Sequence, residues 1–364
     1  MKKIASVVGA RPNFIKLAPI HNLMNDPKYV SSFEHIIIHT GQHYDYKLSE
    51  IFFSEFSLPT PNYNLDVGSA TPGIQIAEII KKLDNLFKSN KIDLVIVYGD
   101  TNSTFAGALA AIKSSINVAH VESGLRSFDR EMPEELNRIL TDHISNFLYP
   151  PTRTAIKNLN SENITGEIIY TGDISVEIIK EAEAKISNSL ILERLELEPK
   201  NYYLFTLHRS ENTNFGCLKS IINIFNKIPE LKIVFPIHPR TAKVLVEINL
   251  YKELQKCKNL QLIDPVGFID FIKLIKCTTK VITDSGGTQK EAYLLNTPCI
   301  TIRNNTEWIE TINEGSNILT GIDVQKTTNA ITNWNPLETS FQNPIFGNGM
   351  TSKIIVDHLK KILE

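Results

Sequence analysis

Three acidic residues, Asp100, Glu122 and Glu134, stand where short apolar runs end or where a helical pattern begins. Carboxylates gathered in one site can divide the work of general acid and general base when their surroundings differ. The three residues therefore indicate a site for proton transfer. Taken singly, each has a structural alternative. Asp100 could cap the helix that follows it, Glu122 could pair with Arg126, and Glu134 suits a helix N-terminus.

A glycine-rich segment, 284–291, reads DSGGTQKE and separates an apolar run from a helical pattern. Ser285, Gly286 and Gly287 would let the backbone approach a ligand closely, and free N–H groups at a helix start attract phosphate. Glu291, about one helical turn further on, is suited to the hydroxyls of a ribose. The structural alternative is an ordinary helix cap with flexible glycines. The segment matches neither a P-loop nor a dinucleotide-binding fingerprint.

Two cations and two histidines are further candidates for contacts with a bound ligand. Arg11 and Lys16 follow the first apolar run and could face a diphosphate, although both could also be solvated side chains. His208 could hydrogen-bond a phosphate or donate a proton, and His238 has the same alternatives, but a single histidine is more often structural. Because no paired metal-ligand spacing occurs, the sequence predicts no metal site.

The elements that must position these residues alternate between short apolar runs and longer amphipathic ones, which favours parallel sheets covered by helices. Ligands of such sheets bind at the carboxyl ends of the strands, where the candidate residues recur, so two facing sheet edges would form a cleft between domains. We expect an N-terminal domain over 1–172, a second over 173–345, and a last segment, 346–364, that could pack back on the first. The predicted strands are Ile4–Val8, Phe33–His39, Leu94–Tyr98, Val118–Val121, Tyr203–Leu207, Ile233–Ile237, Leu260–Ile263, Val281–Thr283 and Cys299–Ile302.

Helical spacing is clearest in four places. A helix is predicted from Pro12, a second over Phe105–Ile112, and a last one over Ser352–Leu363. The fourth pattern places Leu136, Ile139, Leu140, Ile144, Phe147 and Leu148 on one helical stripe.

Composition and charge argue against some classes of function. The chain has 364 residues, 42% of them hydrophobic, and a formal net charge of −2. Without a long basic run, general binding to nucleic acid is not expected. No apolar stretch is long enough to predict a transmembrane helix, and no signal segment is recognised at the N-terminus. The four widely spaced cysteines indicate reduced thiols, so we expect a cytoplasmic protein.

Several long motifs, in order, make the chain resemble the non-hydrolysing UDP-N-acetylglucosamine 2-epimerase family over nearly its whole length. The motifs are GARPNFIKLAP from Gly9, TGQHYD from Thr40, VYGDTNSTFAGALAA from Val97, HVESGLRSFDREMPEELNR from His120, HRSEN from His208, DPVGF from Asp264, DSGGTQKEA from Asp284 and TEWIE from Thr306.

The resemblance implies a glycosyltransferase-B-like fold of two Rossmann-like domains, a homodimer, and interconversion of UDP-GlcNAc and UDP-ManNAc with no metal or redox cofactor. It places the catalytic carboxylates on Asp100, Glu122 and Glu134, and it makes His208 a fourth candidate catalytic residue. Nucleotide and diphosphate contacts are implied for Arg11, Lys16, His208, Ser285, Gly286, Gly287 and Glu291, and Phe271 matches a residue that lines the uridine site.

Departures from the family pattern leave the substrate open. Trp308 replaces an arginine that contacts substrate, and Asp45 replaces a glutamine that regulated members use to bind an allosteric UDP-GlcNAc. The pattern also resembles a subgroup that epimerises UDP-2,3-diacetamido-2,3-dideoxy-glucuronate, a precursor of surface polysaccharide. Further alternatives are a glycosyltransferase of the same fold, a hydrolysing epimerase that releases UDP, and a non-catalytic UDP-sugar sensor.

Overall fold

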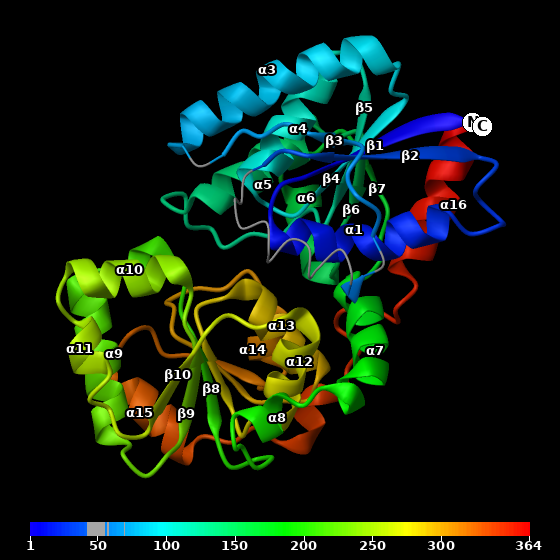
Figure 1. The fold of residues 1–364 in the computed structure, drawn as a ribbon. Helices are drawn as coiled ribbons and strands as arrows, with labels where there is room; N and C mark the ends of the chain where they lie inside the picture. Colours follow the sequence, from blue (N-terminus) through cyan, green and yellow to red (C-terminus); the bar gives the residue numbers. More distant parts are fainter. Residues whose placement is uncertain (42–54, 57, 69) are drawn as a thin grey trace. The chain divides into compact units, whose positions relative to one another are not determined.

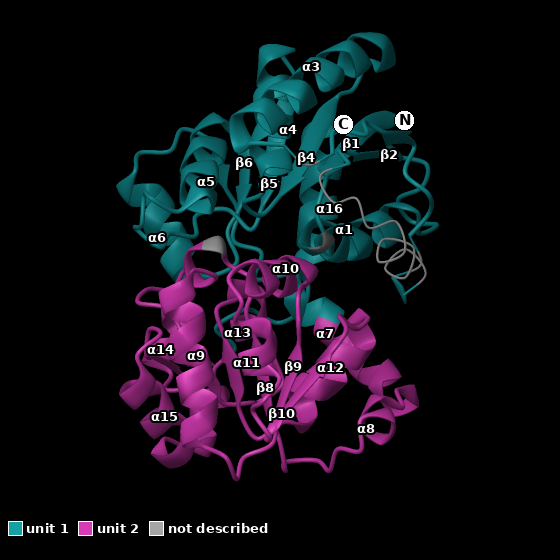
Figure 2. Cartoon of the chain, turned by 60° about the vertical axis from the view of Figure 1, so that its left-hand side comes forward, with its two compact units in different colours: residues 1–178, 344–364 teal, residues 179–343 magenta. Residues whose placement is uncertain are grey.

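A computed structural model describes residues 1–41, 55–56, 58–68 and 70–364, without the side chains of Arg11 and Ser210 (Figure 1). The chain divides into two compact units, coloured separately in Figure 2. Unit 1 comprises Met1–Ile178 and Pro344–Glu364, and unit 2 comprises Ile179–Asn343. The division falls inside helix α7 (Ser175–Lys185), and the chain returns to unit 1 after completing unit 2.

Unit 1 is built on a parallel sheet with seven strands among the described residues, in the order β3-β2-β1-β4-β5-β6-β7. The central strands are continuous apolar runs because helices cover both of their faces. Each β-α-β connection brings the carboxyl ends of the strands to the same edge of the sheet. The strands are β1 (Lys2–Val8), β2 (Phe33–His39), β3 (Tyr63–Asn64), β4 (Leu94–Tyr98), β5 (Asn117–Val121), β6 (Phe147–Tyr149) and β7 (Glu167–Ile168).

The helices of unit 1 form two layers over this sheet (Figure 1). Helices α3 and α4 pack together over one face, where Ile79 and Leu83 meet β-strand side chains such as Val7 and Val97. Helix α1 packs against α16, which is the C-terminal helix of the chain. The unit's helices are α1 (Arg11–Met24), α3 (Pro72–Asn90), α4 (Asn102–Lys113), α5 (Pro133–Ile144), α6 (Arg153–Ser161), the first part of α7, and α16 (Thr351–Leu363).

Unit 2 repeats this architecture with a parallel sheet of six strands in the order β10-β9-β8-β11-β12-β13. Its core centres on the edge-to-face rings of Phe205, Phe225 and Phe235. The strands are β8 (Tyr203–Thr206), β9 (Ile233–Pro236), β10 (Leu260–Ile263), β11 (Val281–Thr283), β12 (Cys299–Thr301) and β13 (Asn317–Leu319). The helices are α8 (Ile191–Arg194), α9 (Phe215–Lys227), α10 (Pro239–Glu247), α11 (Tyr251–Leu254), α12 (Phe268–Cys277), α13 (Gly286–Leu294), α14 (Ile309–Asn313) and α15 (Val324–Asn333), and short 3-10 turns lie at Ile186–Asn188, Ser210–Asn212 and Glu338–Phe341.

The predicted fold class, two α/β units with parallel sheets, is confirmed. One helix prediction is wrong: α5 ends at Ile144, and Phe147 and Leu148 belong to strand β6. Moreover, part of the apolar stripe of α5 faces outward, since Leu136 and Leu140 are 39% and 45% exposed, whereas Ile144 packs against the core. Helix α5 instead buries its polar face, which carries Glu135, Arg138 and Asp142.

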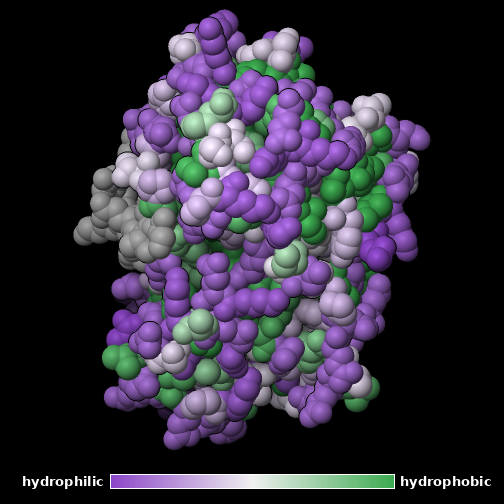
Figure 3. Space-filling view, turned by 90° about the vertical axis from the view of Figure 1, so that its right-hand side faces the viewer, coloured by the Kyte–Doolittle hydropathy of each residue, from purple (hydrophilic) through white to green (hydrophobic). Residues whose placement is uncertain are grey.

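In the part of the chain that the structure describes, no helix has both the length and the apolar character needed to cross a membrane. Hydrophilic side chains cover most of the molecular face in Figure 3, with apolar ones scattered between them. Cys217, Cys257, Cys277 and Cys299 are all free thiols, and two of them, Cys257 and Cys299, are buried.

Candidate active site

In unit 1, three of the predicted residues lie near the carboxyl ends of the neighbouring strands β1, β4 and β5. They are Lys16, Asp100 and Glu122. Glu122 directly follows β5, and its φ of 69° lies in the left-handed region. Such a backbone conformation is uncommon for a residue with a side chain and tends to cluster at functional sites. Gly99 follows β4 with a φ of 66°, and a Cβ at this position would lie 2.9 Å from Lys16 Nζ. The backbone conformation therefore favours glycine there, and any larger residue would require Lys16 Nζ to shift.

Lys16, on α1, donates to Glu122 Oε1 in an ion pair. Their side chains are only 11% and 9% exposed. Two buried charges are stable together because each offsets the loss of hydration of the other, whereas one alone would be costly. The pair places a cation and a carboxylate side by side at the sheet edge. Arg126 has partners elsewhere, Asp142 and Glu162.

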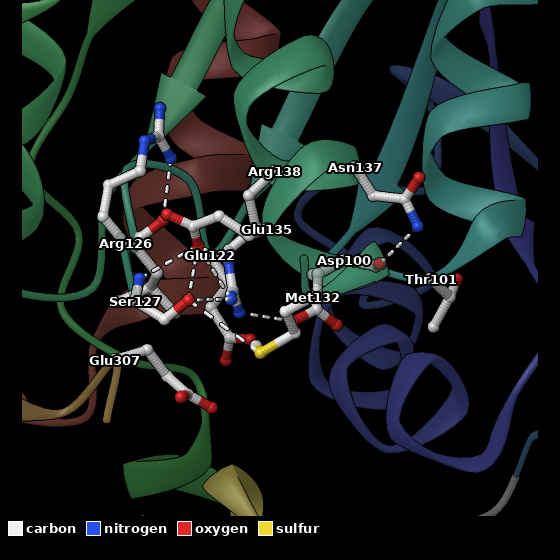
Figure 4. A network of polar contacts seen from close by, with 12 residues as sticks. Asp100, Thr101, Glu122, Arg126, Ser127, Met132, Glu135, Asn137, Arg138 and Glu307 are labelled. Atoms are coloured by element: carbon white, nitrogen blue, oxygen red, sulfur yellow. Dashed lines mark hydrogen bonds and ion pairs between the residues drawn. The ribbon is translucent and has the colours of Figure 1, made fainter. Parts of the chain in front are cut away.

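Asp100 belongs to a second network at the same edge, shown in Figure 4. Its carboxylate pairs with Arg138 at 2.7 Å, and its carbonyl accepts a hydrogen bond from the Asn137 side chain at 2.9 Å. Asp100 is not the cap of α4, because Thr101 occupies that position and accepts from Thr104 N. With its side chain 31% exposed, Asp100 is the more accessible member of its ion pair.

Glu134 and Glu135 are neighbours in the first turn of α5 but differ sharply in environment. Glu135 is completely buried, pairs with Arg138 at 2.9 Å, and accepts from the Ser127 and Phe128 backbone N–H groups. Glu134 is half-buried, and its side chain makes no hydrogen bond or ion pair with the described residues. The structure thus brings Asp100 and Glu135 to Arg138, and Glu134 lies outside this network. Successive helical residues point about 100° apart, so only one of the two can face inward.

His120 connects the strand ends that carry Asp100 and Glu122. Its ring is fully buried in β5, with Nε2 2.7 Å from the Gly99 carbonyl oxygen and Nδ1 2.7 Å from Asp142 Oδ1. Asp142 also accepts from Gly124 N and Arg126. Although burial acts to raise the pKa of Asp142, the hydrogen bonds and charges of His120 and Arg126 hold it below its usual value.

In unit 2, Asp284 is the centre of a corresponding network at the end of β11. His208 Nδ1 lies 3.1 Å from its carboxylate, and Arg209 N and the Asn212 side chain donate to it. Burial opposes ionisation, but these hydrogen bonds and the charge of His208 lower the pKa of Asp284 to about 2. His208, whose side chain is 46% exposed, is thereby held at the edge of the sheet.

The glycine-rich segment forms the turn into α13. Ser285 is the N-cap, and its hydroxyl accepts from Thr288 N, so the structural alternative of a helix cap is confirmed for this residue. A Cβ on Gly286 would lie 2.0 Å from Glu307 Oε1, whereas the nearest atom to one on Gly287 would be 3.9 Å away. The exposed Gly287 leaves the start of the helix accessible to a ligand.

The remaining predicted residues are less closely connected. Glu291 is half-buried in the second turn of α13, and Phe271 is half-buried in α12. His238 caps α10 by accepting from Arg240 N, which is its structural alternative. Arg11 begins α1, but its side chain lies outside the described residues, as does Asp45.

A cluster beside α13 was not predicted from the sequence. Trp308 is 2% exposed, and Lys290 Nζ lies 4.5 Å from the centre of one of its rings, in a cation–π contact. Glu307 pairs with Arg303 at 2.9 Å. Trp308 was recognised only as a departure from the family motif, and nothing in its spacing indicated Lys290 as its partner. No cluster of three metal-ligating side chains occurs in the described ranges.

Each unit is an α/β unit with a parallel sheet and charged residues at the carboxyl ends of its strands, and the chain matches known proteins over nearly its whole length. A solved structure of the Methanocaldococcus jannaschii UDP-GlcNAc 2-epimerase, in complex with UDP-GlcNAc and UDP, superposes with a TM-score of 0.91 at 40% identity over 99% of both chains. The UDP-N-acetylglucosamine 2-epimerase homolog of Methanococcus maripaludis is 49% identical over 99% of this chain and 100% of its own. A UDP-2,3-diacetamido-2,3-dideoxy-D-glucuronate 2-epimerase of Pseudomonas aeruginosa is 37% identical over 99% of this chain and 100% of its own.

The sequence profile described as UDP-N-acetylglucosamine 2-epimerase matches residues 27–360. The chain belongs to the UDP-N-acetylglucosamine 2-epimerase family, and it is therefore an isomerase of the epimerase class. The predicted family is confirmed.

Proposed function

We propose that this enzyme interconverts UDP-GlcNAc and UDP-ManNAc by eliminating UDP and adding it back, without hydrolysis. The observation that carries the proposal is the buried Lys16–Glu122 pair beside Gly99, one residue from Asp100. It places a carboxylate that can accept a proton next to a cation that can stabilise a departing phosphate. The relatives named as 2-epimerases support the same reaction.

The chemistry follows from the acidity of the sugar. The proton at C2 is not adjacent to a carbonyl, so its direct removal is very difficult. If the C1–O bond breaks first, its electron pair leaves with UDP and the sugar becomes oxocarbenium-like, which makes the C2 proton acidic. A carboxylate then takes this proton, and the C–H electrons form the C1–C2 double bond of a 2-acetamidoglucal. Protonation at C2 from the opposite face and return of UDP to C1 give the epimer.

Within this reaction we assign roles by environment. Asp100, Glu122 and Glu134 share the acid and base steps, and Lys16 and Arg11 stabilise the charge on UDP. In unit 2, the N–H groups that begin α13 at Gly286 and Gly287 suit a phosphate, as does the exposed ring of His208. Ser285, Glu291 and Phe271 complete the nucleotide contacts, with Glu291 at the ribose and Phe271 at the uracil.

A second candidate substrate is UDP-2,3-diacetamido-2,3-dideoxy-glucuronate. It is favoured by the buried Trp308, which stands where the family motif has an arginine, and by the Pseudomonas aeruginosa relative that carries this name. The reaction at C2 would be the same. Only the groups that recognise the substituents at C3 and C6 of the sugar would differ.

The deciding experiment is incubation with each UDP-sugar in deuterated water, followed by NMR and mass spectrometry. An epimerase incorporates deuterium at C2 without net release of UDP. Steady release of UDP and free sugar would instead identify a hydrolysing epimerase, and transfer of the sugar only when an acceptor is added would identify a glycosyltransferase. If UDP-sugars bind but none of them incorporates deuterium, the protein would instead be a non-catalytic UDP-sugar sensor. Turnover of the diacetamido uronate alone would select the second substrate.

We further propose a cytoplasmic homodimer. The four free thiols suit a reducing compartment. Leu136 and Leu140 are exposed one turn apart on α5, which suits burial against a second copy. Light scattering on the purified protein tests the dimer, and a monomeric mass at micromolar concentration would contradict it.

A further inference from the structure

Both ring nitrogens of His120 face oxygen atoms. Nε2 lies 2.7 Å from the carbonyl oxygen of Gly99, and Nδ1 lies 2.7 Å from Asp142 Oδ1. A carbonyl oxygen can only accept a hydrogen bond, so Nε2 must carry a proton. A neutral imidazole has a single N–H, and the state of Asp142 therefore decides whether Nδ1 carries one as well.

Asp142 is held as a carboxylate. Its Oδ2 accepts from Gly124 N at 3.0 Å and from Arg126 at 2.7 Å, so two donors already point at this oxygen. Although Asp142 is completely buried, its ion pair with the Arg126 guanidinium favours the charged carboxylate over the neutral acid. An ionised carboxylate only accepts, which requires a second proton on His120, at Nδ1. Arg126 pairs with both Asp142 and Glu162, and His143 lies 3.5 Å from Glu162. Two further charged side chains, Lys16 and Glu122, lie beside Gly99.

We propose that His120 carries protons on both ring nitrogens and is a positioning residue that fixes the separation between Asp100 and Glu122. The inference rests on the proposed function, which assigns those two carboxylates to the reaction. Gly99 N donates to Val121 O at 2.9 Å, and Gly99 O accepts from His120. Both backbone polar groups of Gly99 are thus held by β5, one residue before Asp100 and next to Glu122.

This arrangement explains why a charged imidazole would be buried at this edge. A charge-assisted hydrogen bond is roughly twice as strong as a neutral one, so the imidazolium holds the Gly99 peptide more firmly than a neutral ring would. The strand ends cannot then separate without breaking a bond to a buried charge. Displacing a reacting group by about 1 Å can lower a rate about a hundredfold, so rigid spacing matters for proton transfer.

The direct test is ¹⁵N NMR on the whole protein with labelled histidines. The ring signals of His120 are assigned by through-bond correlation with the backbone signals of the same residue. We expect both ring nitrogens to show one-bond coupling to hydrogen at neutral pH, and the Asp142→Asn variant to lose the proton on Nδ1. A wild-type His120 with one bare ring nitrogen at neutral pH would overturn the inference. Because this measurement needs no substituted protein, it stands even if a variant fails to fold.

The kinetic test compares His120→Gln with His143→Gln, whose histidine lies half-exposed on α5. A glutamine can donate to the Gly99 carbonyl but cannot form the charged bridge to Asp142. We expect kcat for epimerisation to fall at least tenfold in His120→Gln with little change in KM, while His143→Gln stays close to wild type. Equal kcat in both variants would refute the positioning role. If no UDP-sugar is epimerised by the wild type, the proposed function fails, whereas the NMR result still reports on His120.

Discussion

Lys16 and Glu122, which lie 106 residues apart in the chain, form a buried ion pair at the carboxyl edge of the unit 1 sheet. Each side chain neutralises the charge of the other. The two residues are assigned opposite tasks in the proposed reaction, because one stabilises the leaving diphosphate and the other exchanges a proton. Substitutions at the two ends of this pair should therefore have different kinetic signatures.

Replacing Glu122 by Gln should leave UDP affinity unchanged or higher, because Lys16 loses its competing anion. Epimerisation should fall by about 10²–10⁴-fold, the usual contribution of a general acid or base. Lys16→Met should instead weaken UDP binding by about tenfold or more, or roughly 1.4 kcal/mol. Calorimetric titration with UDP and the deuterium exchange assay measure the two effects. Glu78→Gln, on the surface of α3, is the matched control. Full turnover by Glu122→Gln would remove that residue from the mechanism.

Substitutions of the two carboxylates that pair with Arg138 should affect stability and activity differently. Glu135→Gln removes a fully buried charge and leaves Arg138 poorly compensated, so we expect a loss of about 3 kcal/mol in the free energy of unfolding. Asp100→Asn changes a partly exposed carboxylate and should cost less than about 1 kcal/mol while abolishing most deuterium exchange. Urea denaturation and the exchange assay distinguish them. Similar stability losses in both variants would contradict this division.

Gly286 and Gly287 should respond differently to an added methyl group. At Gly286 the new Cβ would meet Glu307 Oε1 at 2.0 Å, so Gly286→Ala should lower stability by about 1–3 kcal/mol and weaken UDP binding. At Gly287 the nearest atom is 3.9 Å away, and Gly287→Ala should keep its stability within about 1 kcal/mol. Thermal unfolding with and without UDP measures both. A Gly286→Ala protein as stable as the wild type would show that Glu307 can move aside.

Acid should weaken unit 2 through Asp284. Its pKa falls from 3.8 to about 2 on folding, so the unfolded chain binds a proton more readily. The resulting stabilisation, on the order of 2 kcal/mol, is fully present above about pH 4 and is lost as the pH falls toward 2. Chemical denaturation at several pH values should show a shallower decline in Asp284→Asn than in the wild type. Parallel curves for the two proteins would argue against this assignment.

Trp308 should not tolerate the arginine of the family motif. Lys290 Nζ lies 4.5 Å from the centre of a Trp308 ring, so Trp308→Arg would bury a second cation beside it. We expect a loss of at least about 2 kcal/mol, whereas Trp308→Phe keeps an aromatic face for Lys290 and should cost less. Guanidinium denaturation of both variants provides the comparison. An arginine variant with wild-type stability would mean that Lys290 can relocate.

Much of the fold could be predicted because buried parallel strands are short continuous apolar runs. The predicted bounds of Phe33–His39, Leu94–Tyr98 and Leu260–Ile263 match the strands in the structure. The placement of Asp100 and Glu122 at one edge follows from the topology, since β4 and β5 are adjacent and parallel. Phe147 and Leu148 were misassigned because a three-residue strand has no periodicity of its own to distinguish it from a continuing helix.

The partners within the site could not be predicted in the same way. Lys16 and Glu122 come from distant segments, and the pattern of either segment alone does not specify the other. Glu134 and Glu135 have the same charge and neighbouring positions, so only the rotation of α5 about its axis decides which one is buried. That rotation is set by Arg138 and Asp142, polar residues that a pattern based on Leu136 and Leu140 assigns to the solvent side.

Helix α16 returns to unit 1 after the chain has passed through all of unit 2, and it packs against α1. Tyr29 OH donates to Asp357 at 2.5 Å, and Tyr149 OH lies 2.9 Å from His358 Nδ1. During synthesis on the ribosome, α1 therefore stays uncovered by α16 until unit 2 has emerged. The packing of unit 1 is therefore completed only after all of unit 2 has been synthesised.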